Sequence, residues 1–169
     1  GATLVGDVLG VALDQRPRAV LVDTWMQADN TRHELTTYEL VQAAAPLHML
    51  HFVATVAEGR VDKQLSVDGA KLVASWRCQF AGQRGGRFST QLNLAMPSCD
   101  GYAGRYVLED GAVPCGFGQQ LVLAGFRHIR LEDGVLGGSL LLTVSRPVTL
   151  NAAPYHTVSL SEAGFEKIM

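Results

Sequence analysis

Hydrophobic and polar side chains alternate along residues 87–97. Every second position from Phe88 to Met96 belongs to one side, which is mainly apolar. The opposite side carries the polar residues Ser89, Gln91 and Asn93. Because successive side chains of a β-strand point to opposite faces, this pattern predicts a strand with one apolar and one hydrogen-bonding face. The proline that follows cannot donate to a strand ladder and marks the end of the strand.

Extended runs and turn residues succeed one another from residue 47 onward, at intervals of roughly 8–12 residues. Asp-Gly dipeptides lie at 68–69, 100–101, 110–111 and 133–134, and Asp-Gly favours hairpins because it accepts positive φ angles. The strands predicted here cover 47–56, 60–66, 70–80, 87–96, 104–108, 119–132, 135–145, 148–150 and 155–160. The pattern predicts an all-β fold, an antiparallel twisted β-sandwich or barrel with at most one short helix.

The first part of the chain is less regular. Residues 19–26 are rich in β-branched and aromatic side chains and predict a strand. Residues 34–45 are the one stretch that fits a helix, which Pro46 would stop. Its segment 36–38, Thr-Thr-Tyr, suits a strand equally well. Residues 2–12 fit either a strand or the end of a preceding element.

Composition favours one domain with a substantial core. The chain has 169 residues, of which 47% are hydrophobic and 18% charged, and its net charge is -2. The absence of a basic excess argues against nucleic acid as a partner, and no apolar run approaches the roughly 18 residues of a membrane helix. We expect residues 1–169 to form a single β-sandwich domain, and since no initiator methionine is present, we expect it to be a piece excised from a longer polypeptide.

The cysteines suggest a reducing compartment. Cys78, Cys99 and Cys115 are odd in number and have no C-x-x-C spacing, so neither a disulfide framework nor a zinc site is expected. Cys78 shares the apolar side of its strand with Trp76, which predicts a buried, free thiol. No basic n-region of a signal peptide is present either. These features favour a cytoplasmic protein.

Catalytic and cofactor motifs are missing from the sequence. Most acidic residues lie in turns, and no two stand out as the carboxylate pair of a glycosidase. Neither a G-x-S-x-G elbow nor a P-loop occurs, and the glycine-rich residues 134–138 indicate a turn. His48 and His51 are three apart, which places them on opposite faces of a strand and disfavours a metal site. We therefore expect no metal, no cofactor and no catalytic residue.

Some aromatic residues could stack on sugar rings. Trp76 alternates with apolar neighbours and is expected in the core. Trp25 ends a strand beside a polar loop, so a core position and a site position are both open. Tyr102 follows the turn at Asp100 and is expected to be exposed. An exposed ring with Asn, Gln and Asp nearby suits carbohydrate, whose apolar face stacks while its hydroxyls form hydrogen bonds.

Three segments, in order, resemble motifs of one protein family. They are residues 16–25, 88–97 and 155–166. Together they resemble the C-terminal β-sandwich module of glycoside hydrolase family 57, the group of 4-α-glucanotransferases and α-amylases. The closing segment is the most specific, because Thr157-Val158-Ser159, Ser161-Glu162 and Gly164-Phe165-Glu166 all match the family pattern.

The resemblance implies a twisted supersandwich similar to galactose mutarotase, packed against an N-terminal catalytic barrel that supplies the catalytic carboxylates. Two positions depart from the family pattern: Asp-His-Phe reads Asp23-Thr24-Trp25, and Gln91 replaces an acidic residue. The residues expected to contact glycan or the catalytic domain are Asp23, Trp25, Gln91, Asn93, Asp100, Tyr102, His156 and Glu162.

Three functions follow as hypotheses. The leading one is a non-catalytic accessory domain of an α-glucan-acting glycoside hydrolase or glucanotransferase, whose partners are the catalytic domain and an α-glucan oligosaccharide. The alternative is a free-standing carbohydrate-binding module. The third is a mutarotase-like enzyme that uses His128 or His156 together with Glu162. Neither nucleic acid nor a membrane is expected as a partner.

Overall fold

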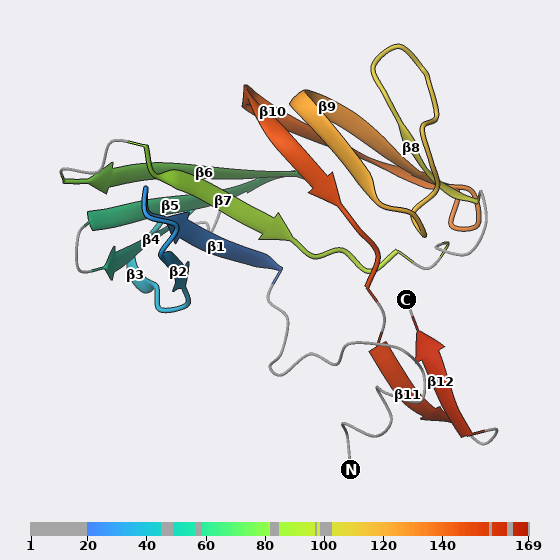
Figure 1. Ribbon diagram of the computed structural model, residues 1–169, viewed down its shortest axis with the longest axis horizontal. Helices are drawn as coiled ribbons and strands as arrows, with labels where there is room; N and C mark the ends of the chain where they lie inside the picture. Colours follow the sequence, from blue (N-terminus) through green and yellow to red (C-terminus); the bar gives the residue numbers. More distant parts are fainter. Residues whose placement is uncertain are drawn as a thin grey trace. The chain divides into compact units, whose positions relative to one another are not determined.

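The computed structural model describes residues 20–44, 49–56, 59–81, 85–96, 98, 103–155, 157–161 and 164–168. Within these ranges the chain forms strands and no helix, and every strand pairing is antiparallel (Figure 1). The predicted all-β antiparallel fold is therefore confirmed. The strands are β1 Leu21–Met26, β2 Arg32–Leu35, β3 Glu39–Ala44, β4 Met49–Val56, β5 Gly59–Asp68, β6 Lys71–Phe80, β7 Arg87–Leu92, β8 Gly104–Val107, β9 Leu121–Asp133, β10 Gly138–Ala152, β11 Thr157–Ser161 and β12 Gly164–Ile168.

The chain divides into two compact units. The first, here called the N-terminal unit, comprises residues 19–93 and holds β1 to β7. The second, the C-terminal unit, includes the described residues from Leu94 onward and holds β8 to β12. The single domain over residues 1–169 stays a prediction.

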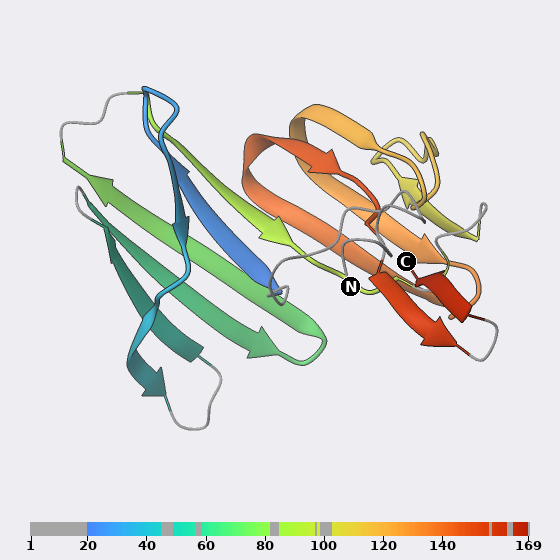
Figure 2. The ribbon, with the colours of Figure 1, turned by 60° about the horizontal axis from the view of Figure 1, so that its bottom comes forward.

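The N-terminal unit is a sandwich of two sheets. The sheet β2-β1-β7 faces the sheet β3-β4-β5-β6 (Figures 1 and 2). Trp25 on β1 stacks on Phe80 of β6 with ring centroids 3.7 Å apart, and Trp76 contacts Phe88 of β7. The buried residues between the sheets are Leu35, Ala54 and Val61. Aromatic rings from both sheets thus fill a small aliphatic core.

A buried ion pair joins the two sheets of this unit. The Asp23 carboxylate on β1 is fully buried, and its Oδ2 accepts hydrogen bonds from Lys63 Nζ at 2.9 Å and Tyr38 Oη at 2.7 Å. Burial raises the pKa of Asp23, but the hydrogen bonds from Tyr38, Lys63 and Thr90 lower it by more. Burial, together with the Asp23 carboxylate, raises the pKa of Tyr38 far above its ordinary value. Asp23 is therefore charged and Tyr38 neutral at pH 7.

The C-terminal unit has its own core on the sheet β10-β9-β8. Tyr106 and Phe117 meet edge to face at 5.1 Å. The turn between β9 and β10 is fixed by Asp133, whose Oδ1 accepts hydrogen bonds from the backbone amides of Val135 and Leu136, both at 3.0 Å. The Ser98 hydroxyl donates to the same oxygen. The Asp-Gly turn predicted at 133–134 is thus confirmed.

Some of the predicted elements are wrong. The helix predicted over 34–45 is absent, because residues 39–44 instead form β3 and pair with β4. Pairing with β4 therefore decides the conformation of a segment whose sequence alone fits either element. The two strands predicted over 135–145 and 148–150 are one strand, β10, which runs from Gly138 to Ala152. A register shift between Thr143 and Val148 takes Pro147 out of the regular ladder.

Cys78 is exposed, although its strand pattern predicts burial. It lies opposite the buried Val61 and so belongs to the inner face of its sheet. Leu72 is on the same face and is 55% exposed. A three-stranded sheet facing a four-stranded one leaves part of the inner face uncovered.

We predict that Lys63→Met lowers the free energy of unfolding of the N-terminal unit by about 3–5 kcal/mol, because Asp23 is left buried without a cation. Chemical denaturation followed by tryptophan fluorescence measures this loss, since Trp25 and Trp76 both lie in this unit. The exposed Lys71 gives the control Lys71→Met, for which we expect a change within about 0.5 kcal/mol. Equal effects at both positions would contradict a stabilising ion pair.

We also predict that Gly86→Ala destabilises the protein by about 1–3 kcal/mol. A Cβ at residue 86 would lie 2.1 Å from the Cζ2 atom of Trp25, whose ring is held by Phe80. Gly138→Ala is the control, because no atom lies within 4 Å of a Cβ at that position. Calorimetric melting temperatures compare the two variants, and a melting temperature of Gly86→Ala equal to wild type would rule out the close approach.

Candidate functional site

A groove of about 450 Å³ lies on the four-stranded sheet of the N-terminal unit. On β5, Val61 and Lys63 point into the sandwich and are buried. The residues that alternate with them, Arg60, Asp62 and Gln64, therefore point to the outer face. The groove, here called the polar groove, is lined by His51, Arg60, Asp62, Gln64, Ser75, Trp76, Arg77 and Gln79. Three neighbouring strands therefore contribute polar side chains to one surface.

Strand register arranges these side chains in rows. His51 on β4, Gln64 on β5 and Ser75 on β6 lie directly opposite one another. The next two rows pair Asp62 with Arg77 and Arg60 with Gln79. Neighbouring strands are roughly 4.8 Å apart, and alternate residues on one strand are roughly 7 Å apart. The polar groove is thus a regular grid of hydrogen-bonding groups on a rigid sheet.

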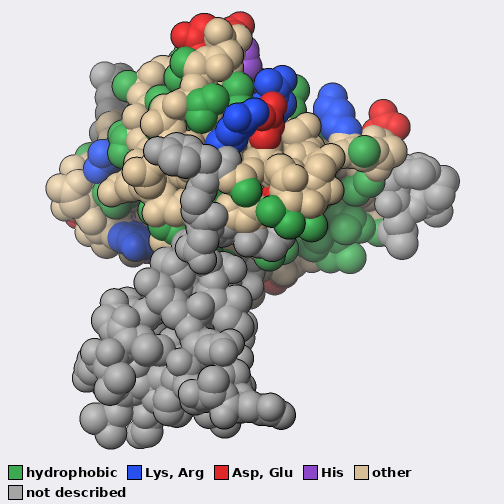
Figure 3. All heavy atoms as spheres, turned by 90° about the vertical axis from the view of Figure 1, so that its right-hand side faces the viewer, with side chains coloured by type: hydrophobic (Ala, Val, Ile, Leu, Met, Phe, Trp, Pro, Cys, Tyr) green, Lys and Arg blue, Asp and Glu red, His purple; other side chains and the backbone are tan. Residues whose placement is uncertain are grey.

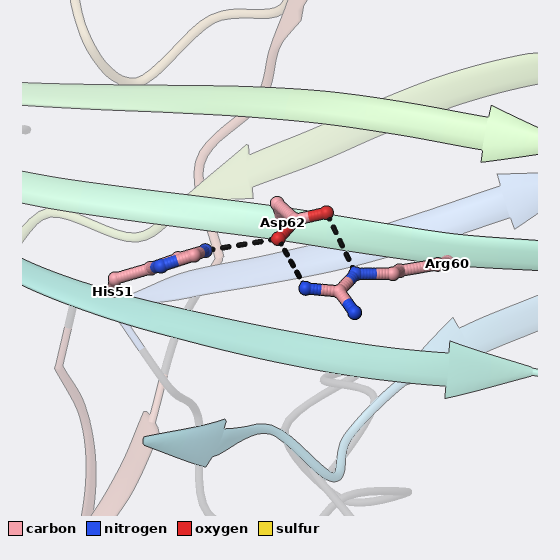
Figure 4. Close-up of polar contacts among 3 residues, drawn as sticks. All are labelled: His51, Arg60 and Asp62. Atoms are coloured by element: carbon pink, nitrogen blue, oxygen red, sulfur yellow. Dashed lines mark hydrogen bonds and ion pairs between the residues drawn. The ribbon is translucent and has the colours of Figure 1, made fainter. Parts of the chain in front are cut away.

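Asp62 is the fixed centre of this grid. Its Oδ1 accepts hydrogen bonds from His51 Nε2 at 2.9 Å and from an Arg60 Nη at 2.8 Å, and its Oδ2 accepts from Arg60 Nε at 2.9 Å (Figure 4). Figure 4 shows both side chains pointing toward the carboxylate from two neighbouring strands. The hydrogen bond from Arg60 is the main cause that lowers the pKa of Asp62 to about 2. The carboxylate is therefore ionised and held in one orientation at pH 7.

The other side chains of the groove are available to a ligand. Within the part of the chain that the structure describes, the side chains of Gln64, Ser75, Arg77 and Gln79 make no hydrogen bond or ion pair. Amide and hydroxyl groups both donate and accept, whereas Arg77 only donates. Among the same described residues, no group of three or more His, Cys, Asp or Glu could hold a metal ion. The chemistry offered is hydrogen bonding to a polar ligand.

Four of the residues predicted as contacts from the sequence are described by the structure, and they lie outside the polar groove. Asp23 and Trp25 are only 0% and 7% exposed, so both face the interior of the sandwich. On β7 and just after it, Gln91 Nε2 donates a hydrogen bond to Asn93 Oδ1 at 2.7 Å. The remaining four lie outside the described residues, namely Asp100, Tyr102, His156 and Glu162. Contact of any of these residues with glycan or a catalytic domain stays a prediction.

A second charged surface lies on the C-terminal unit. Glu132 pairs with both Arg105, at 2.9 Å, and Arg130, at 2.8 Å. Nearby on the same strand, His128 Nε2 lies 3.3 Å from the carboxylate of Glu109, which is 77% exposed. Figure 3 shows blue and red side chains lying next to each other on the face that it displays. Glu132 already has two cations, so it is less available to a ligand than the free groups of the polar groove.

The polar groove has a weak signal in the sequence. Residues 75–79 alternate polar positions with less polar ones, which indicates a strand with one polar face, whereas Lys63 interrupts the alternation in residues 60–64. Their pairing with each other and with His51 depends on strand register, which alternation alone does not give.

The chain matches the model of a known protein family. Residues 9–169 match the family model described as "Alpha-amylase/4-alpha-glucanotransferase, C-terminal". No curated protein and no solved structure matches the chain. In the described part of the chain, no helix is long and apolar enough to cross a membrane. The match spans nearly the whole chain, includes the residues of the polar groove, and agrees with the resemblance that the sequence motifs carry.

We predict that the pKa of Asp62 is about 2 and rises toward its ordinary value in Arg60→Gln, because the main hydrogen bond to the ionised form is lost. A depressed pKa stabilises the fold above the pKa of the unfolded chain. The stability difference between wild type and Arg60→Gln should therefore be full above about pH 4 and vanish as pH falls through about 2. Carbon-detected NMR of the Asp62 carboxyl group measures its pKa in wild type and in Arg60→Gln.

Arg32→Gln serves as the control, because Arg32 lies on the exposed start of β2 in the other sheet. It should leave the pKa of Asp62 unchanged. An unchanged pKa in Arg60→Gln would show that Arg60 does not hold the carboxylate.

Proposed function

Because the chain belongs to the family of α-amylase/4-α-glucanotransferase C-terminal domains, we propose that it is the non-catalytic accessory module of an α-glucan-acting enzyme of glycoside hydrolase family 57. The observation that carries this proposal is the family match over residues 9–169. In this role the module packs against the catalytic domain of the same polypeptide and contacts the glucan.

The state of the carboxylates supports a non-catalytic role. Asp23, Asp62, Glu132 and Asp133 each already hold structural partners, either cations or backbone amides. A glycosidase needs two carboxyl groups placed on either side of the sugar bond, one as acid and one as base or nucleophile. Carboxylates bound to lysine or arginine lack the raised pKa of a general acid. These four carboxylates are therefore poor candidates for catalytic groups, which supports placing catalysis in another part of the parent enzyme.

Exposed hydrophobic side chains support packing against a further domain. On the N-terminal unit, Val67 and Leu72 are 51% and 55% exposed on either side of the turn between β5 and β6. On the C-terminal unit, Leu141 is 63% exposed. Covering such side chains with another protein surface is favourable by roughly 25 cal/mol per Å² of apolar area. A free-standing carbohydrate-binding module has no second domain to cover these positions, which favours the accessory role over that alternative.

We further propose a cytoplasmic location for the parent enzyme. Cys78 and Cys115 are free thiols, as expected of a protein from a reducing compartment.

The proposal predicts that the 169-residue chain alone neither hydrolyses nor transfers maltooligosaccharides. Chromatography of reaction mixtures with maltoheptaose tests this, with the complete parent enzyme as positive control.

Deleting this module from the parent should lower its melting temperature and its activity, since the catalytic domain then exposes the surface that the module covers. Product formation by the chain alone would overturn the non-catalytic role, and a parent unaffected by the deletion would overturn the packing.

A further inference from the structure

We propose that the polar groove on β4, β5 and β6 is a binding site for an α-glucan oligosaccharide, held through its hydroxyl groups. The identity of this ligand rests on the proposed function, whereas the place and polarity of the site rest on the geometry of the sheet. Of the contact residues expected from the sequence, the four that the structure describes, namely Asp23, Trp25, Gln91 and Asn93, do not line this groove.

The groove matches a polyol better than an anion. A sugar hydroxyl both donates and accepts hydrogen bonds, and Gln64, Ser75 and Gln79 offer both kinds of group. An anion accepts only, so it would leave the amide oxygens unpaired. The charge of Arg60 is already neutralised by Asp62, which leaves Arg77 as the free cation among the residues lining the groove. A neutral ligand with many hydroxyls satisfies the largest number of these groups.

The site is organised before the ligand arrives. His51 and Arg60 hold Asp62 in one orientation, and all three side chains stand on paired strands. Groups fixed in this way lose little conformational entropy when they bind. The cross-strand row of His51, Gln64 and Ser75 lies beside the row of Asp62 and Arg77, so an extended chain of sugar units can follow the rows across the sheet.

The groove binds weakly, because it lacks an aromatic platform. Trp76 lines the groove, but its ring faces the interior of the sandwich, where it contacts Phe88 with centroids 5.9 Å apart. Without stacking, affinity comes from hydrogen bonds, each of modest net strength. We therefore expect a dissociation constant on the order of 1 mM.

The test is an NMR titration of the ¹⁵N-labelled 169-residue chain with maltoheptaose. We expect amide shift changes at residues 51, 62, 64, 75, 77 and 79, and the exposed Gln64→Ala should weaken binding about fivefold. Ser75→Ala is the second variant, and denaturation curves verify that both fold like wild type. Lys71→Ala is the matched control, because Lys71 lies on the same face of β6 but outside the groove. Inorganic phosphate and the β-linked cellohexaose are titrated in parallel.

Each outcome decides between separate claims. Shifts in the groove with maltoheptaose that Gln64→Ala weakens and Lys71→Ala preserves support the site. Maltoheptaose shifts confined to other residues overturn the site but leave glucan contact by this module standing. Binding of phosphate alone overturns the ligand class, and equal binding of cellohexaose overturns selectivity for α-glucan. No binding of any probe overturns the inference, while the deletion experiment on the parent still judges the accessory role on its own.

Discussion

The charge of Asp23 constrains the whole N-terminal unit. A carboxylate that is fully buried between two sheets is tolerated only with a cation and further hydrogen bonds. Lys63 supplies the cation from the opposite sheet, and Tyr38 supplies a hydroxyl from the segment that leads into β3. Because these three groups come from three places in the chain, the ion pair forms only when both sheets are in place. A packing that separated the two sheets would leave the Asp23 carboxylate buried without its cation.

The extended elements were largely predictable because their signals are local. Alternation and Asp-Gly turns placed most strands from β4 to β9 close to their observed bounds, and Gly69 and Gly111 take the positive φ angles that such turns require. The segment 34–45 was not predictable, since its sequence fits a helix and a strand equally and only pairing with β4 decides. The continuation of β10 past Pro147 also depends on a partner strand, which the sequence does not display.

The site was harder to predict than the fold. The motif-based resemblance pointed to the C-terminal module of α-amylases and 4-α-glucanotransferases, and the match over residues 9–169 confirms that this chain belongs to that family. Motif residues such as Asp23 and Trp25 lie in the interior of the sandwich. Their role in packing accounts for a recognisable sequence motif just as well as contact with a ligand does. The polar groove has no motif, because its residues come from three strands and are brought together by register. Family patterns therefore indicated which module this is, and the arrangement of its strands indicated where a ligand fits.

Strand β5 ties the interior of the sandwich to its outer surface. Its residues alternate between the buried Val61 and Lys63 on one side and Arg60, Asp62 and Gln64 on the other. A slip of a single residue against β4 or β6 would exchange the two sets, placing the Asp62 carboxylate inside and exposing the Lys63 ammonium. Such a misaligned chain would lose both the buried ion pair between Asp23 and Lys63 and the polar groove. The strand register that buries the Lys63–Asp23 ion pair is therefore the same register that assembles the polar groove on the outer face.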